Sequence, residues 1–167
     1  PLVTRELTFA GNSAQRLFHN VASSLSFTGT TLAVRNALWR DNSGEILTEN
    51  TGHTLFENCT FHNNASNMTA AGTSRLALYN SIVWDNSMAL TSSLGGSVSV
   101  DFTDINASFP GLGTGNLNTN PLFVSIADGN FHLQHTSPCI DAGDTNSPYS
   151  NEPYPNGQAP YDKASPS

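Results

Sequence analysis

Two aspartates and an asparagine recur at one spacing and could bind a cation or perform acid–base chemistry. Asp41, Asn63 and Asp85 follow one another at equal intervals along the chain. Carboxylate and amide oxygens suit Ca²⁺, so the three residues form a candidate calcium site. As a catalytic pair, carboxylates two repeats apart would be separated by about 9–10 Å, which reaches the upper edge of an inverting glycosidase pair. We favour the alternative that these residues cap turns.

A second set of side chains at the same spacing has the chemistry of a sugar platform. Arg40, His62 and Trp84 each directly precede one of the three oxygen-bearing residues. A guanidinium, an imidazole and an indole stacked in one column could hold a sugar ring. The competing interpretation is a solvated face that carries one exposed aromatic, and it is the one we favour. We regard the column as a carbohydrate-binding candidate and name no catalytic residue.

Asparagines follow the same period in two registers. The constant spacing predicts one ladder of Asn20, Asn42, Asn64 and Asn86 and a second of Asn36, Asn58 and Asn80. An inward asparagine is costly unless it is paired, and asparagines stacked along an axis can pair with each other. Asparagine also tolerates the left-handed backbone that sharp turns require. We therefore interpret both registers as structural ladders.

The elements that must position these residues are short strands in stacked coils. One apolar column has the same period as the asparagines and comprises Leu17, Trp39, Phe61, Val83 and Ile105. A fixed period in this range indicates a solenoid, because each repeat buries its apolar side on the next. Short strands in successive coils then pair in parallel. The predicted fold is all-β: a right-handed parallel β-helix with three short strands per ~22-residue coil and a C-terminal capping segment.

The pattern divides the chain into three parts. Residues 1–106 are predicted to form the coils, because the register ends after Ile105. Residues 107–144 are predicted to form a closing coil and C-terminal cap, and residues 145–167 a tail rich in Pro and Asn. An offset in the pattern before Leu32 predicts that one early coil has a different length.

Composition excludes two classes of function. Only 11% of the 167 residues are charged and the net charge is −7, with no basic cluster of the kind that a nucleic-acid binder needs. No apolar run is long enough to insert into a membrane. Asn67 and Asn106 lie in glycosylation sequons and are the candidate glycan acceptors outside the ladders.

Several segments resemble one known superfamily. The stretches 56–64 and 78–86 are similar to coils of bacterial right-handed parallel β-helix proteins, the pectate-lyase-like superfamily and its secreted and surface relatives. The stretches 100–105, 115–124 and 131–143 resemble the closing region of large secreted members. The resemblance covers about residues 32–157 and implies an extracellular or cell-surface location. It does not imply one activity, since the fold carries lyases, hydrolases, adhesins and spacers.

The sequence favours a non-catalytic extracellular β-helix module that acts as a surface or adhesive protein, a spacer or a self-assembling structural protein. The alternative is a polysaccharide lyase or glycoside hydrolase of the pectate-lyase-like fold, and enzymatic activity stays open. No cofactor is expected apart from the calcium candidate. Expected partners are further copies of the chain, because a short β-helix exposes pairing edges at an uncapped end, and a polysaccharide.

Overall fold

The computed structural model describes residues 2–5, 8–13, 16–22, 31–65, 67–87, 89–106 and 113–146. Within these ranges the regular structure consists of strands, with no helix. The strands are β1 (Leu2–Arg5), β2 (Thr8–Ala10), β3 (Arg16–Ala22), β4 (Thr31–Arg35), β5 (Leu38–Arg40), β6 (Glu45–Asn50), β7 (His53–Glu57), β8 (Thr60–His62), β9 (Met68–Ala71), β10 (Arg75–Tyr79), β11 (Ile82–Trp84), β12 (Leu90–Ser93), β13 (Ser97–Asp101), β14 (Asp104–Ile105), β15 (Phe123–Ser125) and β16 (Asn130–Leu133).

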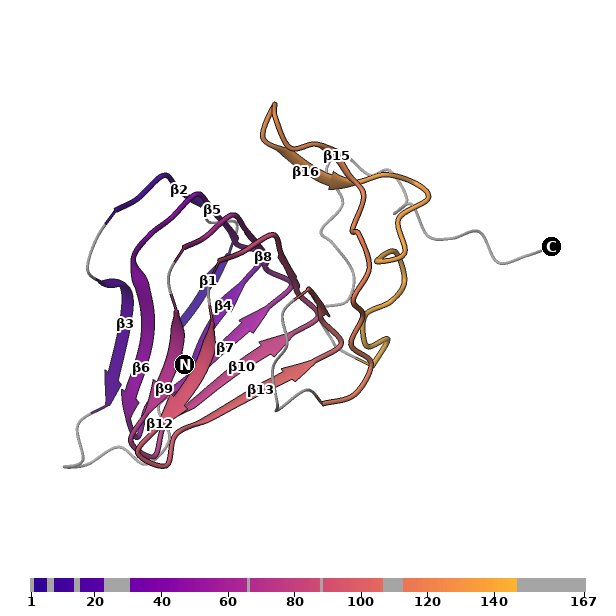
Figure 1. Cartoon of the computed structure of the whole chain (residues 1–167). Coiled ribbons are helices and arrows are strands. Elements are labelled where there is room, and N and C mark those ends of the chain that lie inside the picture. The colour runs from indigo at the N-terminus through magenta and orange to yellow at the C-terminus, as the bar shows by residue number, and fades with distance from the viewer. Residues whose placement is uncertain are drawn as a thin grey trace.

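The strands stack into a parallel β-solenoid with three long sheets (Figure 1). Sheet A has the order β1-β4-β7-β10-β13, sheet B the order β14-β11-β8-β5-β2, and sheet C the order β12-β9-β6-β3. Thr31 lies beside His53 and Arg75 lies beside both His53 and Ser97, so β4 and β13 are three equal turns apart. Strands this short gain stability by pairing between coils. The predicted all-β solenoid is confirmed.

The first coil is longer than the coils that follow. Leu2 lies beside Leu32 and Phe9 beside Trp39, whereas in later coils Leu32 lies beside Thr54 and Trp39 beside Phe61. The predicted change of coil length before Leu32 is therefore confirmed. The placement of Leu17 in the Trp39 column was wrong, because it assumed the later spacing for this coil as well. Phe9 holds that position, and Leu17 belongs to β3 of sheet C.

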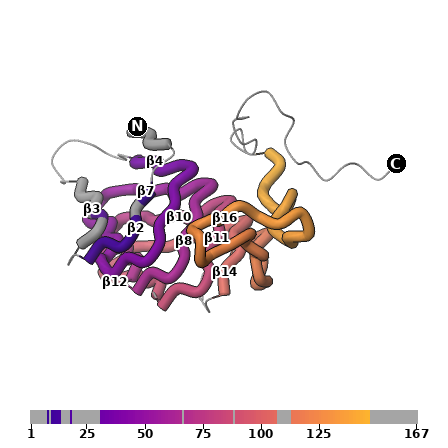
Figure 2. Tube along the Cα trace, turned by 90° about the horizontal axis from the view of Figure 1, so that it is seen from above, coloured from indigo at the N-terminus to yellow at the C-terminus, as the bar shows by residue number. Residues whose placement is uncertain are grey.

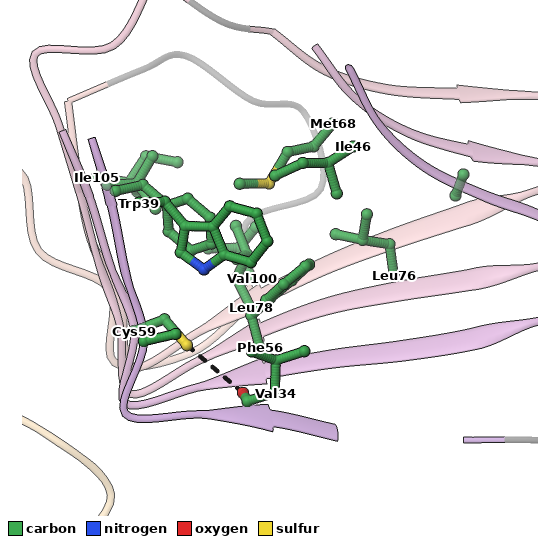
Figure 3. Close-up of a cluster of buried hydrophobic side chains, with 14 residues drawn as sticks. Val34, Trp39, Ile46, Phe56, Cys59, Met68, Leu76, Leu78, Val100 and Ile105 are labelled. Atoms are coloured by element: carbon green, nitrogen blue, oxygen red, sulfur yellow. Dashed lines mark hydrogen bonds between the residues drawn. The ribbon is translucent and has the colours of Figure 1, made fainter. Parts of the chain in front are cut away.

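The core is a narrow column of apolar side chains enclosed by the three sheets (Figure 3). Sheet B contributes Trp39 and Phe61, whose rings stack at a centroid distance of 5.7 Å. Phe56 of sheet A meets Phe61 edge-on at 5.4 Å, and Met68 of sheet C is also fully buried. Burying each such side chain contributes roughly 1.5–3 kcal/mol. The same inward positions recur one coil later, as the period-two alternation of the strands requires.

Left-handed residues turn the chain at each corner. Positive φ angles occur at Asn36, Asn58, Asn80 and Phe102 between sheets A and B, at Asp41, Asn63 and Asp85 between sheets B and C, and at Asn50, Gly72 and Leu94 between sheets C and A. Asn, Asp and Gly adopt this backbone at least cost. The left-handed backbone required at each corner thus explains why Asn and Asp recur once in every coil.

The C-terminal part of the described chain has two sections. Residues 113–117 lie against the last coil, where Gly113 N–H donates to Val100 C=O at 2.8 Å and Leu117 bridges to Asp104. Residues 118–146, called the strap below, run back along the flank of the solenoid and include the antiparallel hairpin β15–β16 (Figure 2). Residues 147–167, most of the predicted tail, lie outside the described residues.

Candidate functional site

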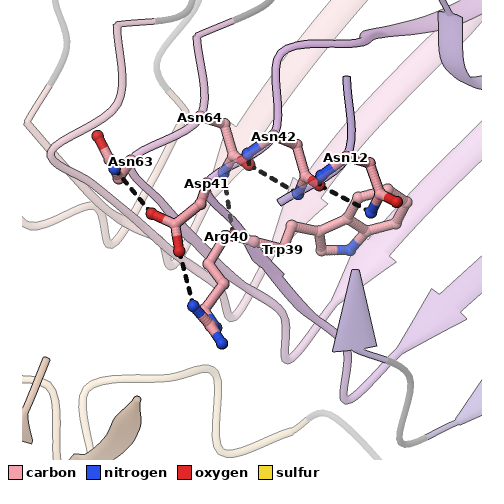
Figure 4. Close-up of polar contacts among 7 residues, drawn as sticks. All are labelled: Asn12, Trp39, Arg40, Asp41, Asn42, Asn63 and Asn64. Carbon is pink, nitrogen blue, oxygen red and sulfur yellow. Dashed lines mark hydrogen bonds and ion pairs between the residues drawn. The ribbon is translucent and has the colours of Figure 1, made fainter. Parts of the chain in front are cut away.

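One asparagine ladder runs along the solenoid as a chain of amide hydrogen bonds (Figure 4). Asn12 Nδ2 donates to Asn42 Oδ1, Asn42 Nδ2 to Asn64 Oδ1, and Asn64 Nδ2 to Asn86 Oδ1, each at 3.0 Å. Each Oδ1 also accepts the backbone N–H of the preceding asparagine, for example Asn42 N–H to Asn64 Oδ1 at 3.1 Å. These amides bond one coil to the next and leave little capacity for a ligand.

The first member of this ladder is Asn12, and Asn20 lies elsewhere. Asn20 is in β3, with its Cα beside that of Thr48. The prediction of Asn20 extended the regular spacing into the longer first coil, where Asn12 is the residue that bonds Asn42. A local signal in the sequence identifies the right residue: Asn12-Ser13 repeats the pairs Asn42-Ser43 and Asn86-Ser87.

The register of Asn36, Asn58 and Asn80 marks a corner of the backbone. Their φ angles are 53°, 55° and 47°. Their N–H groups donate to carbonyls of the next coil at 3.2–3.3 Å, in the order Glu57, Tyr79 and Asp101. Asn80 has an additional contact, because its Oδ1 accepts the N–H of Asp144 in the strap at 2.8 Å. The three asparagines therefore share a left-handed turn and a backbone bond to the next coil.

The oxygen-bearing column of Asp41, Asn63 and Asp85 is hydrogen-bonded within the protein. Both Asp41 oxygens already accept bonds at 2.7 Å, one from Asn63 Nδ2 and one from Arg40 Nη1. The bond from Asn63 and the neighbouring guanidinium hold the pKa of Asp41 below its usual value. Asp85 Oδ1 accepts Asn106 Nδ2 at 3.4 Å. Among the described residues, no three His, Cys, Asp or Glu side chains are grouped to hold a metal ion.

The Arg40, His62 and Trp84 column exists, but it is not an open face. The three residues lie side by side on successive strands of sheet B. His62 is only 7% exposed, since the strap places Phe131 and Phe123 against its ring at centroid distances of 5.2 and 6.1 Å. The prediction of a solvated face, which we favoured from the sequence, is thus wrong at His62.

The strap is anchored to the coils at Asp104, which is a buried carboxylate of β14. Its Oδ1 accepts the N–H of Thr119 at 3.0 Å, and its Oδ2 accepts the Cys139 thiol at 3.0 Å. Partial burial and the Asp104 carboxylate raise the pKa of Cys139 to about 12, which keeps the thiol protonated as a donor. Cys139 and Cys59 are both free thiols.

A second anchor joins the end of the strap to β10. The Tyr79 hydroxyl donates to the Asp144 carboxylate. This bond, with burial and the nearby acids Glu57 and Asp101, raises the pKa of Tyr79 to about 12, and it lowers the pKa of Asp144. Neither anchor was predicted from the sequence, because neither Asp104 nor Asp144 belongs to a periodic column of like residues.

The two glycan-acceptor candidates are on the surface. Asn67 and Asn106 are both exposed. Asn67 Oδ1 accepts the N–H of Ala89 at 3.2 Å, and Asn106 contacts Asp85 as described above. Their exposure is compatible with glycan attachment, which stays a prediction.

Comparison with known proteins gives no assignment. No protein-family model, curated protein or solved structure matches this chain significantly. Within the described residues, no helix has the length and apolar character needed to cross a bilayer. The arguments about function therefore rest on the geometry of the solenoid and its strap.

Proposed function

We propose that this chain is a non-catalytic β-solenoid module that acts as a rigid structural or spacer element outside the cell or on its surface. The observation that supports this proposal is that the polar columns connect coils to each other. The asparagine ladder bonds successive coils, and Asp41 is engaged by Asn63 and Arg40. On sheet A, buried Glu57 accepts Arg35 Nε at 2.7 Å.

The extracellular location and the membership of the pectate-lyase-like superfamily are the finer part of the proposal. They are supported by the likeness of residues 56–64 and 78–86 to coils of bacterial parallel β-helix proteins. The chain's low content of charged residues, 11%, is in keeping with a stacked solenoid whose polar positions are Asn, Ser and Thr.

Self-association is proposed at the edge formed by the first coil. β1, β2 and β3 are the terminal strands of sheets A, B and C. Terminal strands offer backbone groups to a further strand, and a second copy of this chain is the partner that we propose. Light scattering over a range of concentrations should show a rising average mass, and a strict monomer at all concentrations would remove this part of the proposal.

The absence of catalysis is tested with a panel of neutral and acidic polysaccharides. We expect neither new reducing ends nor unsaturated products, with or without added Ca²⁺. The variants Asp41→Asn and Asp85→Asn serve as matched controls, because they remove the carboxylates that a hydrolase would use. A product formed by the wild-type chain and lost in either variant would establish the carbohydrate-active alternative.

A further inference from the structure

The last coil of the solenoid is covered over sheets A and B but not over sheet C. The segment 113–117 lies over the end of sheet A at Val100 and over sheet B at Ile105. Sheet C ends at β12, and among the described strands none pairs with its outer side (Figure 1). Ser92 and Ser93 of β12 are exposed. The solenoid therefore has an open edge at β12 as well as at the first coil.

The backbone of β12 directs a donor toward this open edge. Ile46 N–H donates to Asn67 C=O and Met68 N–H to Ala89 C=O, both at 3.0 Å, so these donors face the following coil. Leu90 lies beside Met68 and holds the same position in β12, beyond which no described strand of sheet C follows. Exposed edges are normally protected by charged side chains or Pro, and β12 contains neither. The edge is thus suited to pairing with a further strand.

The apolar column inside sheet C is incompletely covered at both of its ends. The strand registers place Phe18, Ile46, Met68 and Leu90 in this column. Ile46 and Met68 are buried, whereas Phe18 and Leu90 are only partly buried. A strand that brought a second Phe18 beside Leu90 would cover both side chains and continue the column, and this burial is favourable.

The asparagine ladder has a direction, and its two ends complement each other. Within the ladder each Oδ1 accepts the N–H of the preceding asparagine, as Asn86 Oδ1 accepts Asn64 N–H at 2.9 Å. Asn12 donates to Asn42 through its N–H and its Nδ2, and no described group donates to Asn12 Oδ1. At the other end, no described group accepts the Asn86 N–H. An acceptor at one end and a donor at the other fit a head-to-tail contact, whereas two like ends do not.

We propose that copies of this chain associate head-to-tail, with β3 of one copy pairing in parallel with β12 of the next and extending sheet C across the contact. This inference rests on the self-association proposed above and names the surface that the first coil meets. Because the segment 113–117 occupies the end of sheet B, the contact is confined to sheet C and the corner before it. A head-to-tail contact repeats in one direction, so it yields oligomers larger than dimers.

The register of the coils specifies the contact residue by residue. Phe18 lies beside Ile46 and Val21 beside Glu49 at the first coil, and Leu90 and Ser93 hold the corresponding positions at β12. Extending this register across the contact places three pairs side by side, the first residue from β12 or its corner and the second from the first coil of the next copy: Leu90 and Phe18, Ser93 and Val21, Asn86 and Asn12.

The register is tested by cross-linking two variants, Ser93→Cys and Val21→Cys, with a short bismaleimide. We expect the mixture to give a covalent dimer of the two variants and neither variant alone to give one. The matched control Ser99→Cys places a thiol at an exposed position of neighbouring β13 and should not cross-link to Val21→Cys. The native thiols of Cys59 and Cys139 have pKa values raised to about 12, so they react slowly, and the wild-type chain measures this background.

The outcomes separate this inference from the self-association on which it rests. Cross-linking of Val21→Cys with itself would show that two first coils meet, and it would overturn the head-to-tail contact while self-association stands. A light-scattering mass that rises with concentration, without a cross-link between Ser93→Cys and Val21→Cys, would also overturn the proposed register. A chain that stays monomeric at every concentration would remove both proposals.

Hydrogen exchange on the unaltered chain gives a test that needs no substitution. The Leu90 N–H should gain several-fold protection over the concentration range in which the mass rises, because pairing with β3 supplies an acceptor. The Gln134 N–H, which already donates to Leu122 C=O in the strap, is the control and should not change. If exchange at Leu90 does not depend on concentration while the mass rises, β12 is not the contact.

Discussion

The regular coils and the strap are built by different rules. Between β4 and β14 each strand residue lies beside its counterpart in the next coil, so one contact is repeated along an axis. The strap instead makes single contacts with residues far away in sequence, such as Cys139 with Asp104 and Asp144 with Tyr79. Repetition makes the coils cooperative, because each is supported from both sides. The strap has no repeated neighbours of this kind. Its docking on the coils therefore depends on single contacts such as these two.

The largest effect that separates the two regions should come from aromatic truncation. Phe56 is fully buried and touches both Trp39 and Phe61, so Phe56→Ala should cost about 3–5 kcal/mol of unfolding free energy. Phe123→Ala should loosen the strap and leave the unfolding of the coils almost unchanged. Urea denaturation followed by circular dichroism measures both. Equal losses in the two variants would show that strap and coils unfold as one unit.

The asparagine ladder should give the next largest effect. Asn64→Ala leaves two donors of buried Asn42 without their acceptor, at about 1–3 kcal/mol for each unsatisfied group. Asn86→Ala, at the half-buried end of the ladder, should cost less, because water can replace the lost bonds. Thermal unfolding by calorimetry compares the two variants. A larger loss for Asn86→Ala would contradict the importance of burial along the ladder.

The docking of the strap should depend on pH through the contact of Tyr79 with Asp144. The pKa of Tyr79 is raised to about 12, so the contact contributes fully below about pH 10, the ordinary value for tyrosine, and is lost as pH rises toward 12. The pKa of Asp144 is lowered, so its contribution is present above about pH 3.9 and is lost as pH falls through the folded-state value.

Exchange of the Gln134 amide, corrected for its intrinsic pH dependence, reports strap opening across this range. Tyr79→Phe should remove the alkaline loss of protection and retain a weaker docking at neutral pH. If the loss of protection at high pH persists unchanged in Tyr79→Phe, another group is responsible for it. The nearest candidate is the Cys139 thiol, whose pKa is also raised to about 12.

The smallest effect should arise at a corner of the coils. Leu94 has a φ of 53° and is 88% exposed, where its column has Asn50 and Gly72 in the same conformation. Leu94→Asn should stabilise the solenoid by about 0.5–1 kcal/mol, because asparagine adopts this backbone at lower cost. The reciprocal change Asn50→Leu should destabilise it. Melting temperatures test the pair, and a stabilising Asn50→Leu would contradict the account of the corners.

The sequence was sufficient to predict the positions of residues whose contacts repeat from coil to coil. It was insufficient for residues whose contacts do not repeat. The inward positions of Trp39, Phe61 and Val83 follow from periodicity, because stacking places equivalent residues together. The placements of Asn20 and Leu17 were wrong because they kept the later spacing within a coil whose different length the offset before Leu32 had already indicated. The burial of His62 was also unpredictable, since the covering rings, Phe123 and Phe131, come from a segment without repeats.

The uneven length of the first coil shows where this solenoid accepts additional chain. Ala22 pairs with Asn50 and Thr31 with His53, so the chain between Ala22 and Thr31 is longer than the chain between their partners. The pairing on either side of it, from Phe18 to Ala22 and from Thr31 to Arg35, keeps its register. At the equivalent corner of a later coil, a Cβ on Gly96 would lie 2.3 Å from the Ala70 carbonyl oxygen, which leaves no room for a bulkier turn. For protein engineering, the interval after Ala22 is therefore the place to insert a peptide epitope for display, and the corner at Gly96 is one to avoid.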